Sequence, residues 1–153
     1  MVSVTTIFTK SICNSAGFVV VERKFTMAEP IPEDVRAILK AEPFMERCCC
    51  TGKSNPQWHH NFEYARKAVN EAWCILPLAP EVHLRVRERK LRQLLDWCML
   101  NRGKKGDLRR FSRVNDYIYR LDQLNALYGE FSQRKLRQFY ETKEYEVIPL
   151  LPV

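Results

Sequence analysis

The sequence lacks any run of apolar residues long enough to cross a membrane, since a spanning helix needs about 20 of them in succession. Its start also lacks the basic residues, apolar stretch and small-residue cleavage site of a secretory signal. We therefore expect a cytoplasmic protein with no membrane partner. No internal repeat or low-complexity segment is present, and 46% hydrophobic residues beside 28% charged ones exclude a disordered or fibrous chain.

The six cysteines lack the spacing of a structural zinc site, which needs two C-x2-C pairs. Three are adjacent, Cys48 to Cys50, and cannot act as spaced disulfide staples, while Cys13, Cys74 and Cys98 stand alone. We expect free thiols. A chain of 153 residues buries roughly 68–70% of its unfolded surface, so it needs neither disulfides nor a metal to fold. A bound metal would therefore serve chemistry.

Positive charge is concentrated in one segment. The chain has 25 Lys and Arg against 18 Asp and Glu, a formal charge of +7. Between Arg85 and Arg113, eleven basic residues face only three acidic ones, so this segment accounts for the whole excess. Such a segment is typical of a solvated helical face or of a surface that binds a polyanion.

Hydrophobic spacing, prolines and glycines predict an α+β protein with three regions: a poorly patterned extension over 1–26, a domain over 27–101 and a helical region over 102–153. Within the extension only Phe18–Val21 suits a strand. The remaining predicted elements are a helix over 33–41, a hairpin-like element over 44–60 with arms at Cys48–Cys50 and Gln57–His59, a strand over 75–78, a helix from Pro80 to about Asn101 ended by Gly103 to Gly106, a helix capped by Asp107 and ended near Gly129, a helix over 132–142 and an extended tail over 147–153.

All three histidines lie within one short window, at His59, His60 and His83. A single histidine is usually a satisfied core residue, but three of them on a strand end and in the first turn of a later helix can converge. Adjacent strand residues point to opposite faces, so His59 and His60 should have different roles.

These residues resemble the HNH nucleases, whose fold is the ββα-metal motif. The resemblance covers about residues 46–90 and is carried by Cys48-Cys-Cys-Thr-Gly52, Trp58-His-His60, Ile75-Leu-Pro-Leu78 and His83. It implies a ββα-metal module followed by a predominantly helical C-terminal part, with DNA as the substrate and RNA as an open alternative. The compact size is similar to that of phage or mobile-element nucleases, which implies a bacterial or phage-infected host cell.

The resemblance also implies the roles of the histidines. His59 and His83 would bind one divalent metal ion, and His60 would be the general base that activates water. Mg²⁺ is the expected ion, although two imidazoles would also accept Mn²⁺, Ni²⁺ or Zn²⁺. The sequence departs from the family at two positions: the family's middle asparagine falls near Cys74, with Asn70 four residues too early, and a further helix ligand falls on Arg87.

The basic segment would then bind the phosphates of nucleic acid, largely without regard to sequence. Arg85, Arg89 and Arg92 have the spacing of one helical face. The residues expected to contact the backbone are Arg85, Arg87, Arg89, Arg92, Lys104 and Lys105, with Arg109 and Arg110 as a possible extension.

Two other functions fit the sequence. The first is a non-catalytic nucleic-acid-binding protein in which the histidines hold a structural metal, favoured by the displaced Asn70. The second is an adaptor that binds proteins through its helical C-terminal half. The C-terminal helices either pack on the module or form a homodimer. Glu63 and Glu71 are interpreted as surface carboxylates, and Trp58, Phe62, Tyr64 and Trp73 as packing residues.

Overall fold

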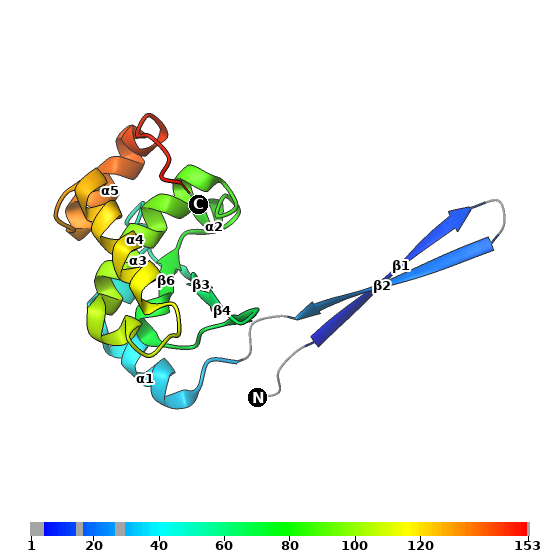
Figure 1. Cartoon of the computed structure of the whole chain (residues 1–153). Helices are drawn as coiled ribbons and strands as arrows, with labels where there is room; N and C mark the ends of the chain where they lie inside the picture. The colour runs from blue at the N-terminus through cyan, green and yellow to red at the C-terminus, as the bar shows by residue number, and fades with distance from the viewer. Residues whose placement is uncertain (1–4, 15–16, 27–29, 153) are drawn as a thin grey trace.

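The computed structural model describes residues 5–14, 17–26 and 30–152 (Figure 1). Helices and small antiparallel sheets are mixed along the chain, which confirms the predicted α+β class. The elements are β1 (Thr5–Asn14), β2 (Gly17–Thr26), α1 (Glu33–Ala41), η1 (Pro43–Glu46), β3 (Gln57–His60), β4 (Glu63–Tyr64), β5 (Lys67–Ala68), η2 (Ala72–Cys74), β6 (Ile75–Leu78), α2 (Pro80–His83), α3 (Arg89–Leu108), α4 (Val114–Tyr128), α5 (Gln133–Thr142) and η3 (Glu144–Glu146), where η marks a single 3₁₀ turn.

Strands β1 and β2 form an antiparallel pair with Thr5 opposite Thr26 and Asn14 opposite Gly17. The predicted strand at Phe18–Val21 lies inside β2, but the pattern gave no sign of its partner. The predicted boundary at Met27 lies outside the described residues.

The second sheet joins β3 to β6, with Gln57 opposite Leu78 and His60 opposite Ile75. All four residues of β6 are buried, as its continuous apolar run predicts. The hairpin-like element was predicted wrongly at its first arm, because Cys48–Cys50 form a turn instead of a strand. Gly52, at a φ of +75°, donates its N–H to the Cys48 carbonyl at 2.9 Å and closes this turn. An isolated bridge between Arg47 and Ser54 and a 2.9 Å hydrogen bond from the Cys48 N–H to the Lys53 carbonyl join the two sides of this segment.

Helix α3 forms the centre of the main core and packs beside α4 and α5 (Figure 1). Trp97 on α3 is fully buried, with Tyr128, Phe131 and Phe139 around its ring at centroid distances of 5.1, 4.9 and 5.7 Å. Removing such a side chain costs about 3–5 kcal/mol of unfolding free energy. Within the described part of the chain, no helix combines the length and apolar character required of a membrane span.

The predicted helix from Pro80 to Asn101 is two helices. α2 ends at His83, and α3 begins only at Arg89. Arg85, between them, is held by Glu88 at 2.9 Å, by Glu146 at 3.5 Å and by the Tyr145 hydroxyl at 3.1 Å. These contacts turn Arg85 toward the C-terminal segment, so the predicted common face of Arg85, Arg89 and Arg92 does not exist.

The predicted helix end at Gly103 to Gly106 coincides with a break in α3: Lys104 has a non-helical φ of +56°, and a short helical stretch continues beyond this kink to Leu108. Gly103 also has a packing role. A Cβ atom there would lie 2.4 Å from Cε3 of Trp73, so only glycine lets the helix approach this ring.

The C-terminal helices agree better with the sequence. α5 begins after Ser132, whose hydroxyl accepts the Lys135 N–H at 3.1 Å, and α4 ends at Gly129 with a φ of +89°. Asp107 lies inside α3 and does not cap α4. The tail contains the 3₁₀ turn Glu144–Glu146 and no strand among residues 147–152, while Val153 lies outside the described residues.

Candidate functional site

His59 and His83 come together at the edge of the second sheet. His59 lies on β3, and His83 is the last residue of α2, which directly follows β6 through Ala79. Their ring centroids are 5.0 Å apart and the ring planes meet at 64°. The antiparallel pairing of β3 with β6 places the start of α2 beside Gln57, so two segments 24 positions apart in the sequence meet there.

Each of the three histidines is hydrogen-bonded by a carboxamide side chain. Nδ1 of His83 lies 2.8 Å from Oε1 of Gln57, and Nε2 of His60 lies 2.6 Å from Oδ1 of Asn70. The side chain of Asn61 forms a hydrogen bond with His59. An amide oxygen only accepts, so Nδ1 of His83 and Nε2 of His60 carry the protons in their contacts with Gln57 and Asn70. The other nitrogen then keeps a lone pair for a metal ion or a proton.

Asn70 therefore contacts the histidine that the sequence assigns to base catalysis, although its position is four residues from that of the family's asparagine. The intervening chain makes one tight turn, in which Ala65 and Arg66 have φ values of +52° and +66°. β4 and β5 form a small hairpin around these residues. The chain folds back on itself in this hairpin, and Asn70 lies beside His60 after it.

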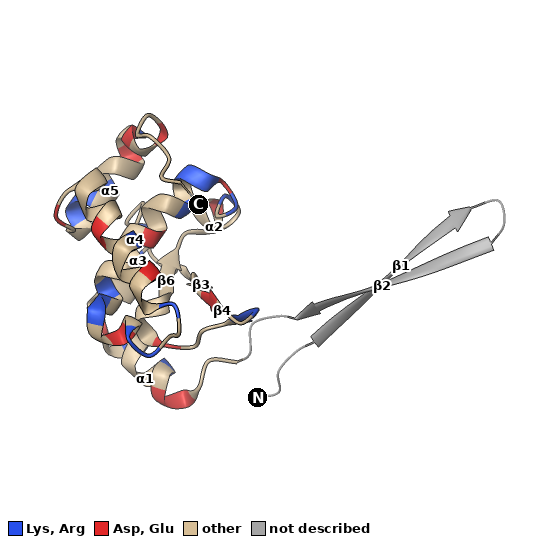
Figure 2. Ribbon diagram, viewed as in Figure 1, with Lys and Arg blue, Asp and Glu red and all other residues tan. Residues whose placement is uncertain are grey.

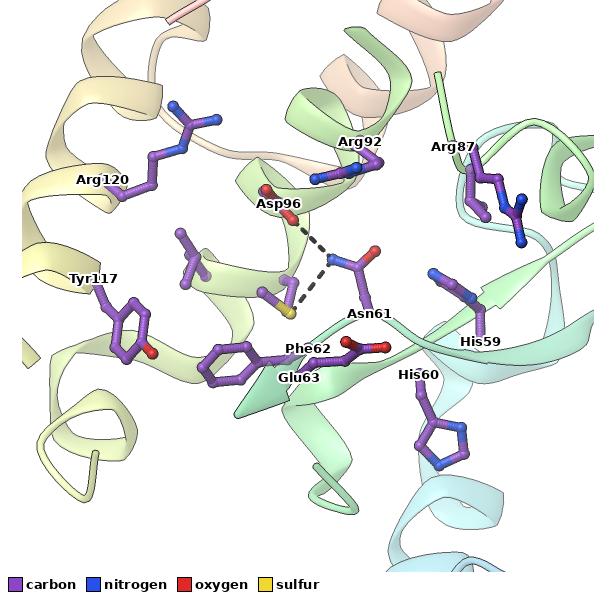
Figure 3. Close-up of a pocket in the computed structure, with 13 residues that line it drawn as sticks. His59, His60, Asn61, Phe62, Glu63, Arg87, Arg92, Asp96, Tyr117 and Arg120 are labelled. Carbon is purple, nitrogen blue, oxygen red and sulfur yellow. Dashed lines mark hydrogen bonds between the residues drawn. The ribbon is translucent and has the colours of Figure 1, made fainter. Parts of the chain in front are cut away.

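His60 points away from the ring of His59 (Figure 3). This agrees with the expectation that adjacent strand residues take opposite faces. Both residues are half-buried and both line the same hollow, whose volume is about 480 Å³. The pair that faces each other is therefore His59 and His83, with His60 at the rim on the other side of the strand end.

Burial changes the protonation of the facing pair. Burial lowers the pKa of His59 to about 4, and the nearby charge of His83 adds to this effect. Burial also lowers the pKa of His83. Both imidazoles are accordingly neutral at pH 7, the form in which histidine binds metal ions.

Asn61 joins the histidine pair to helix α3. Its Nδ2 donates a hydrogen bond to Oδ1 of Asp96 at 3.0 Å and lies 3.4 Å from the sulfur of Met99 (Figure 3). Burial raises the pKa of Asp96 to about 6, while Asn61, Arg120 and Arg92 oppose the effect. The amide of Asn61 thus contacts His59 on one side and the Asp96 carboxyl on the other.

The hollow beside the histidines is lined by basic side chains from two helices and from the turn before α3. Arg87, Arg92 and Arg120 contribute guanidinium groups to it, together with Asn61, Asp96 and Tyr117 (Figure 3). Lys and Arg residues occur in several elements of the molecule and not in one helix alone (Figure 2).

The residues predicted to bind nucleic acid are divided among different places. Arg87, Arg89 and Arg92 line this hollow or the one adjoining it. Arg85 instead lies in the ion pairs described above. Lys105 is 3.9 Å from Asp122, and Lys104 is exposed at the kink of α3.

The donor set fits a divalent metal ion only in part. His59 and His83 each offer one free ring nitrogen, but among the described side chains no three histidines, cysteines or carboxylates are grouped so as to hold an ion. Glu63 lines the hollow as an exposed carboxylate, whereas Glu71 accepts the Trp73 indole N–H at 3.0 Å and pairs with Arg110. Two imidazoles would leave the remaining coordination positions to water and substrate oxygens.

The five cysteines whose side chains are described are free thiols with no exposed surface: Cys48, Cys49, Cys50, Cys74 and Cys98. A hydrogen bond with Cys50 lowers the pKa of the Cys48 thiol to about 5, against the opposing effect of burial. Burial raises the pKa of Cys98. These thiols lie in the main core.

Sequence reasoning missed Asn61, Asp96, Tyr117 and Arg120 as parts of the site. Asn61 follows the histidine pair directly, a position that could have suggested a contact with it. Asp96 follows Arg92 by one helical turn, which places both on one side of α3. Tyr117 and Arg120 belong to α4, and nothing in the sequence connects that helix with the histidines. The predicted packing roles of Phe62 and Trp73 are confirmed by their burial and a centroid distance of 5.4 Å.

A comparison of the chain with models of protein families found no match, and neither did searches among curated proteins and solved structures.

Proposed function

We propose that the protein is a metal-dependent endonuclease of the HNH type that hydrolyses DNA phosphodiester bonds. The observation that carries this proposal is the facing pair of His59 and His83, 5.0 Å apart, beside a hollow lined by arginines. The order β3, β6, α2 is also the order of strand, strand and helix in the ββα-metal motif. We propose that these three elements, at Gln57–His60, Ile75–Leu78 and Pro80–His83, are that module.

His59 and His83 would hold the ion through the ring nitrogens that their amide partners leave free. Gln57 fixes the tautomer of His83 and Asn61 that of His59, an arrangement typical of ligating histidines. When bound, a divalent ion supplies positive charge that polarises the scissile phosphate and stabilises the leaving oxygen. Mg²⁺ prefers oxygen ligands, so Mn²⁺, Ni²⁺ and Zn²⁺ suit a two-imidazole site at least as well.

His60 would accept the proton of the attacking water. Asn70 bonds its Nε2, which leaves Nδ1 as the basic nitrogen. A neutral imidazole is a suitable base near pH 7. Because the His60 ring points away from His59, the scissile phosphate must lie at the end of β3, where both residues line one hollow. The arginines of that hollow would hold the flanking phosphates.

The test is nicking of supercoiled plasmid DNA by the purified protein with Mg²⁺ or Mn²⁺. We expect cleavage by the wild type, loss of cleavage in His60→Ala, and nearly unchanged Mn²⁺ and DNA binding in the same variant. Asn70→Ala is the matched positioning variant: it should reduce cleavage less than His60→Ala does and should leave Mn²⁺ affinity unchanged. Wild-type protein that binds DNA and cuts it in none of the divalent metals would refute the enzyme.

The direction of the His60 ring favours a second candidate, a non-catalytic nucleic-acid-binding protein with a structural metal at His59 and His83. In that protein the ion would raise thermal stability without any cleavage. Measuring both the melting temperature and plasmid nicking with Mn²⁺ separates the two functions. The adaptor hypothesis predicts indifference to DNA at every salt concentration.

A further inference from the structure

The hollow beside the histidines continues past them over helices α3 and α4. A second hollow of about 340 Å³ shares Arg92, Asp96, Tyr117 and Arg120 with the first. Its far wall consists of Leu150, Leu151 and Pro152 from the C-terminal segment. The two hollows therefore adjoin at the four shared residues, and we call them together the α3–α4 groove. Each half lies within the ~300–1,000 Å³ range of small-molecule sites.

Some of the charged side chains of the groove form ion pairs within the protein and others do not. Arg87, Arg89, Arg92 and Arg120 form no ion pair and no hydrogen bond with any side chain that the structure describes, while Arg113 pairs with Asp116 at 3.0 Å. Arg85 and Arg102, outside the groove, are both held by carboxylates. Free guanidinium groups gathered in a groove are suited to bidentate binding of phosphate.

Arg92 on α3 and Arg120 on α4 lie on either side of Asp96 (Figure 3), and the charge of each favours the ionised carboxyl. One carboxyl between two guanidinium groups leaves a net positive charge. Glu63, the remaining unpaired carboxylate of the groove, lies at the histidine end. The centre of the groove, shared by both halves, is therefore the place where an added anion gains most.

The same centre contains an aromatic ring. Tyr117 is half-buried and lines both halves, and its ring is supported from the side by Phe62 and Phe111 at centroid distances of 5.2 and 6.2 Å. These neighbours hold the ring in place while part of it faces the groove. A supported ring beside arginines is the usual means of binding an unpaired base and its phosphate together.

We propose that the α3–α4 groove binds a single DNA strand, with Arg92 and Arg120 on one phosphate and Tyr117 against an unpaired base. A strand in this groove runs from the histidine end to the C-terminal segment at Leu150–Pro152. A paired duplex has no free base for Tyr117 and does not enter a hollow of this size. The inference deepens the proposed function, on which it rests for the choice of DNA, by naming the form of the substrate.

The experiment is fluorescence anisotropy of a labelled oligothymidylate with the full chain in EDTA, at several salt concentrations. Arg120→Ala and Arg92→Ala should each weaken binding at least about fivefold and make the slope of log K against log salt shallower by about 0.7. Arg134→Ala is the matched control, because Arg134 lies on α5, is exposed, is unpaired among the described residues and lies outside the groove. It should change the affinity less than twofold.

Two further variants test the aromatic contact. Tyr117→Leu keeps apolar packing but removes the ring, and should weaken binding at least about fivefold. Tyr117→Phe should bind as the wild type does. Thermal melts of every variant report whether a loss of binding comes from unfolding. If Arg92→Ala or Arg120→Ala melts early, the corresponding Lys substitution replaces it, because lysine keeps the charge and loses only the bidentate guanidinium geometry.

Equal effects of Arg120→Ala and Arg134→Ala would overturn the proposal, and so would unlabelled duplex that competes as well as the single strand. These readouts need neither metal nor cleavage, so they are independent of the nuclease test. If the protein binds the single strand through the groove residues but does not nick plasmid DNA, the groove proposal is supported and the nuclease proposal is refuted. If it nicks DNA but the groove variants bind the strand as the wild type does, the groove proposal is refuted and the nuclease proposal is supported.

Discussion

The protein has two clusters of residue types that bind metals in other proteins, the histidines and the cysteines, and the two clusters differ in solvent exposure. The histidines are half-buried along a groove, each with an amide partner, whereas the described cysteines have no exposed surface. Helix α3 joins the clusters: Asp96 faces the histidine side through Asn61, and Cys98 lies in the core beside Cys49. Residue type alone therefore does not identify a site; access and hydrogen-bond partners separate a candidate ligand from a core residue.

Among substitutions that test the difference between the histidine and cysteine clusters, we expect the largest effect on metal affinity. His59→Ala and His83→Ala should each weaken Mn²⁺ binding about a hundredfold, since losing only a hydrogen-bond partner of a ligating histidine costs 10–100-fold. Cys48→Ala, in the other cluster, should leave the affinity unchanged. Isothermal titration with Mn²⁺ measures both, and a metal affinity that follows Cys48 instead of His59 would reverse the assignment.

The next effect is on stability and concerns the cysteine side of α3. Cys98→Ser places a hydroxyl where no surface is exposed and should lower the free energy of unfolding by about 1–3 kcal/mol. Cys98→Ala, which adds no polar group, should cost less. Urea denaturation measures the difference, and Mn²⁺ affinity should be the same in both variants. Equal stability of the serine and alanine variants would mean that the hydroxyl finds a partner in the core.

The histidine side of α3 should respond to pH. The folded state raises the pKa of Asp96 from 3.8 to about 6, so ionisation destabilises the folded state as pH rises through that interval. This shift in pKa corresponds to a loss of about 3 kcal/mol in the free energy of unfolding, and the partial exposure of Asp96 reduces the loss to about 1–2 kcal/mol. Asp96→Asn should therefore be more stable than the wild type at pH 8 and equally stable at pH 3.5. Arg92, Arg120 and Asn61 face the group, and urea titrations at the two pH values test the sign.

The smallest effect is the reactivity of the thiols. In a Cys13→Ser variant, the five remaining cysteines should react with Ellman's reagent only as fast as the protein opens, although the pKa of Cys48 is about 5. Adding urea should expose all five together. Rapid reaction of one thiol in the native protein would show that the core around Cys48 opens locally.

Part of the fold could be predicted because neighbouring residues decide it. Pro32 and Pro43 flank the helix Glu33–Ala41, and Ser132 and Gly129 set the limits of the last two helices. The strand Ile75–Leu78 follows from its apolar run between η2 and Pro80. The break after His83 could not be predicted, because the contacts made there include one between Arg85 and Tyr145, which lie 60 positions apart in the sequence.

The site divides in the same way. The approach of His59 to His83 was predicted from their places on a strand and in the next helix, and their separation of 5.0 Å agrees with it. The contact of Asn70 with His60 was not predicted, because a hairpin at 63–68 lies between the two residues. Asp96 and Arg120 were missed because their relation to the histidines depends on how α3 and α4 pack.

The sequence by itself determined the local elements, the concentration of histidines and basic residues, and the absence of spaced cysteine pairs. Only the tertiary structure decided which strand pairs with β3, which arginines form ion pairs and which remain unpaired along a groove. The physical reason is the distance along the sequence over which each kind of interaction acts. Caps, prolines and apolar periodicity act over one or two turns, whereas pairing and burial depend on residues far apart in the chain that compete for the same few contacts.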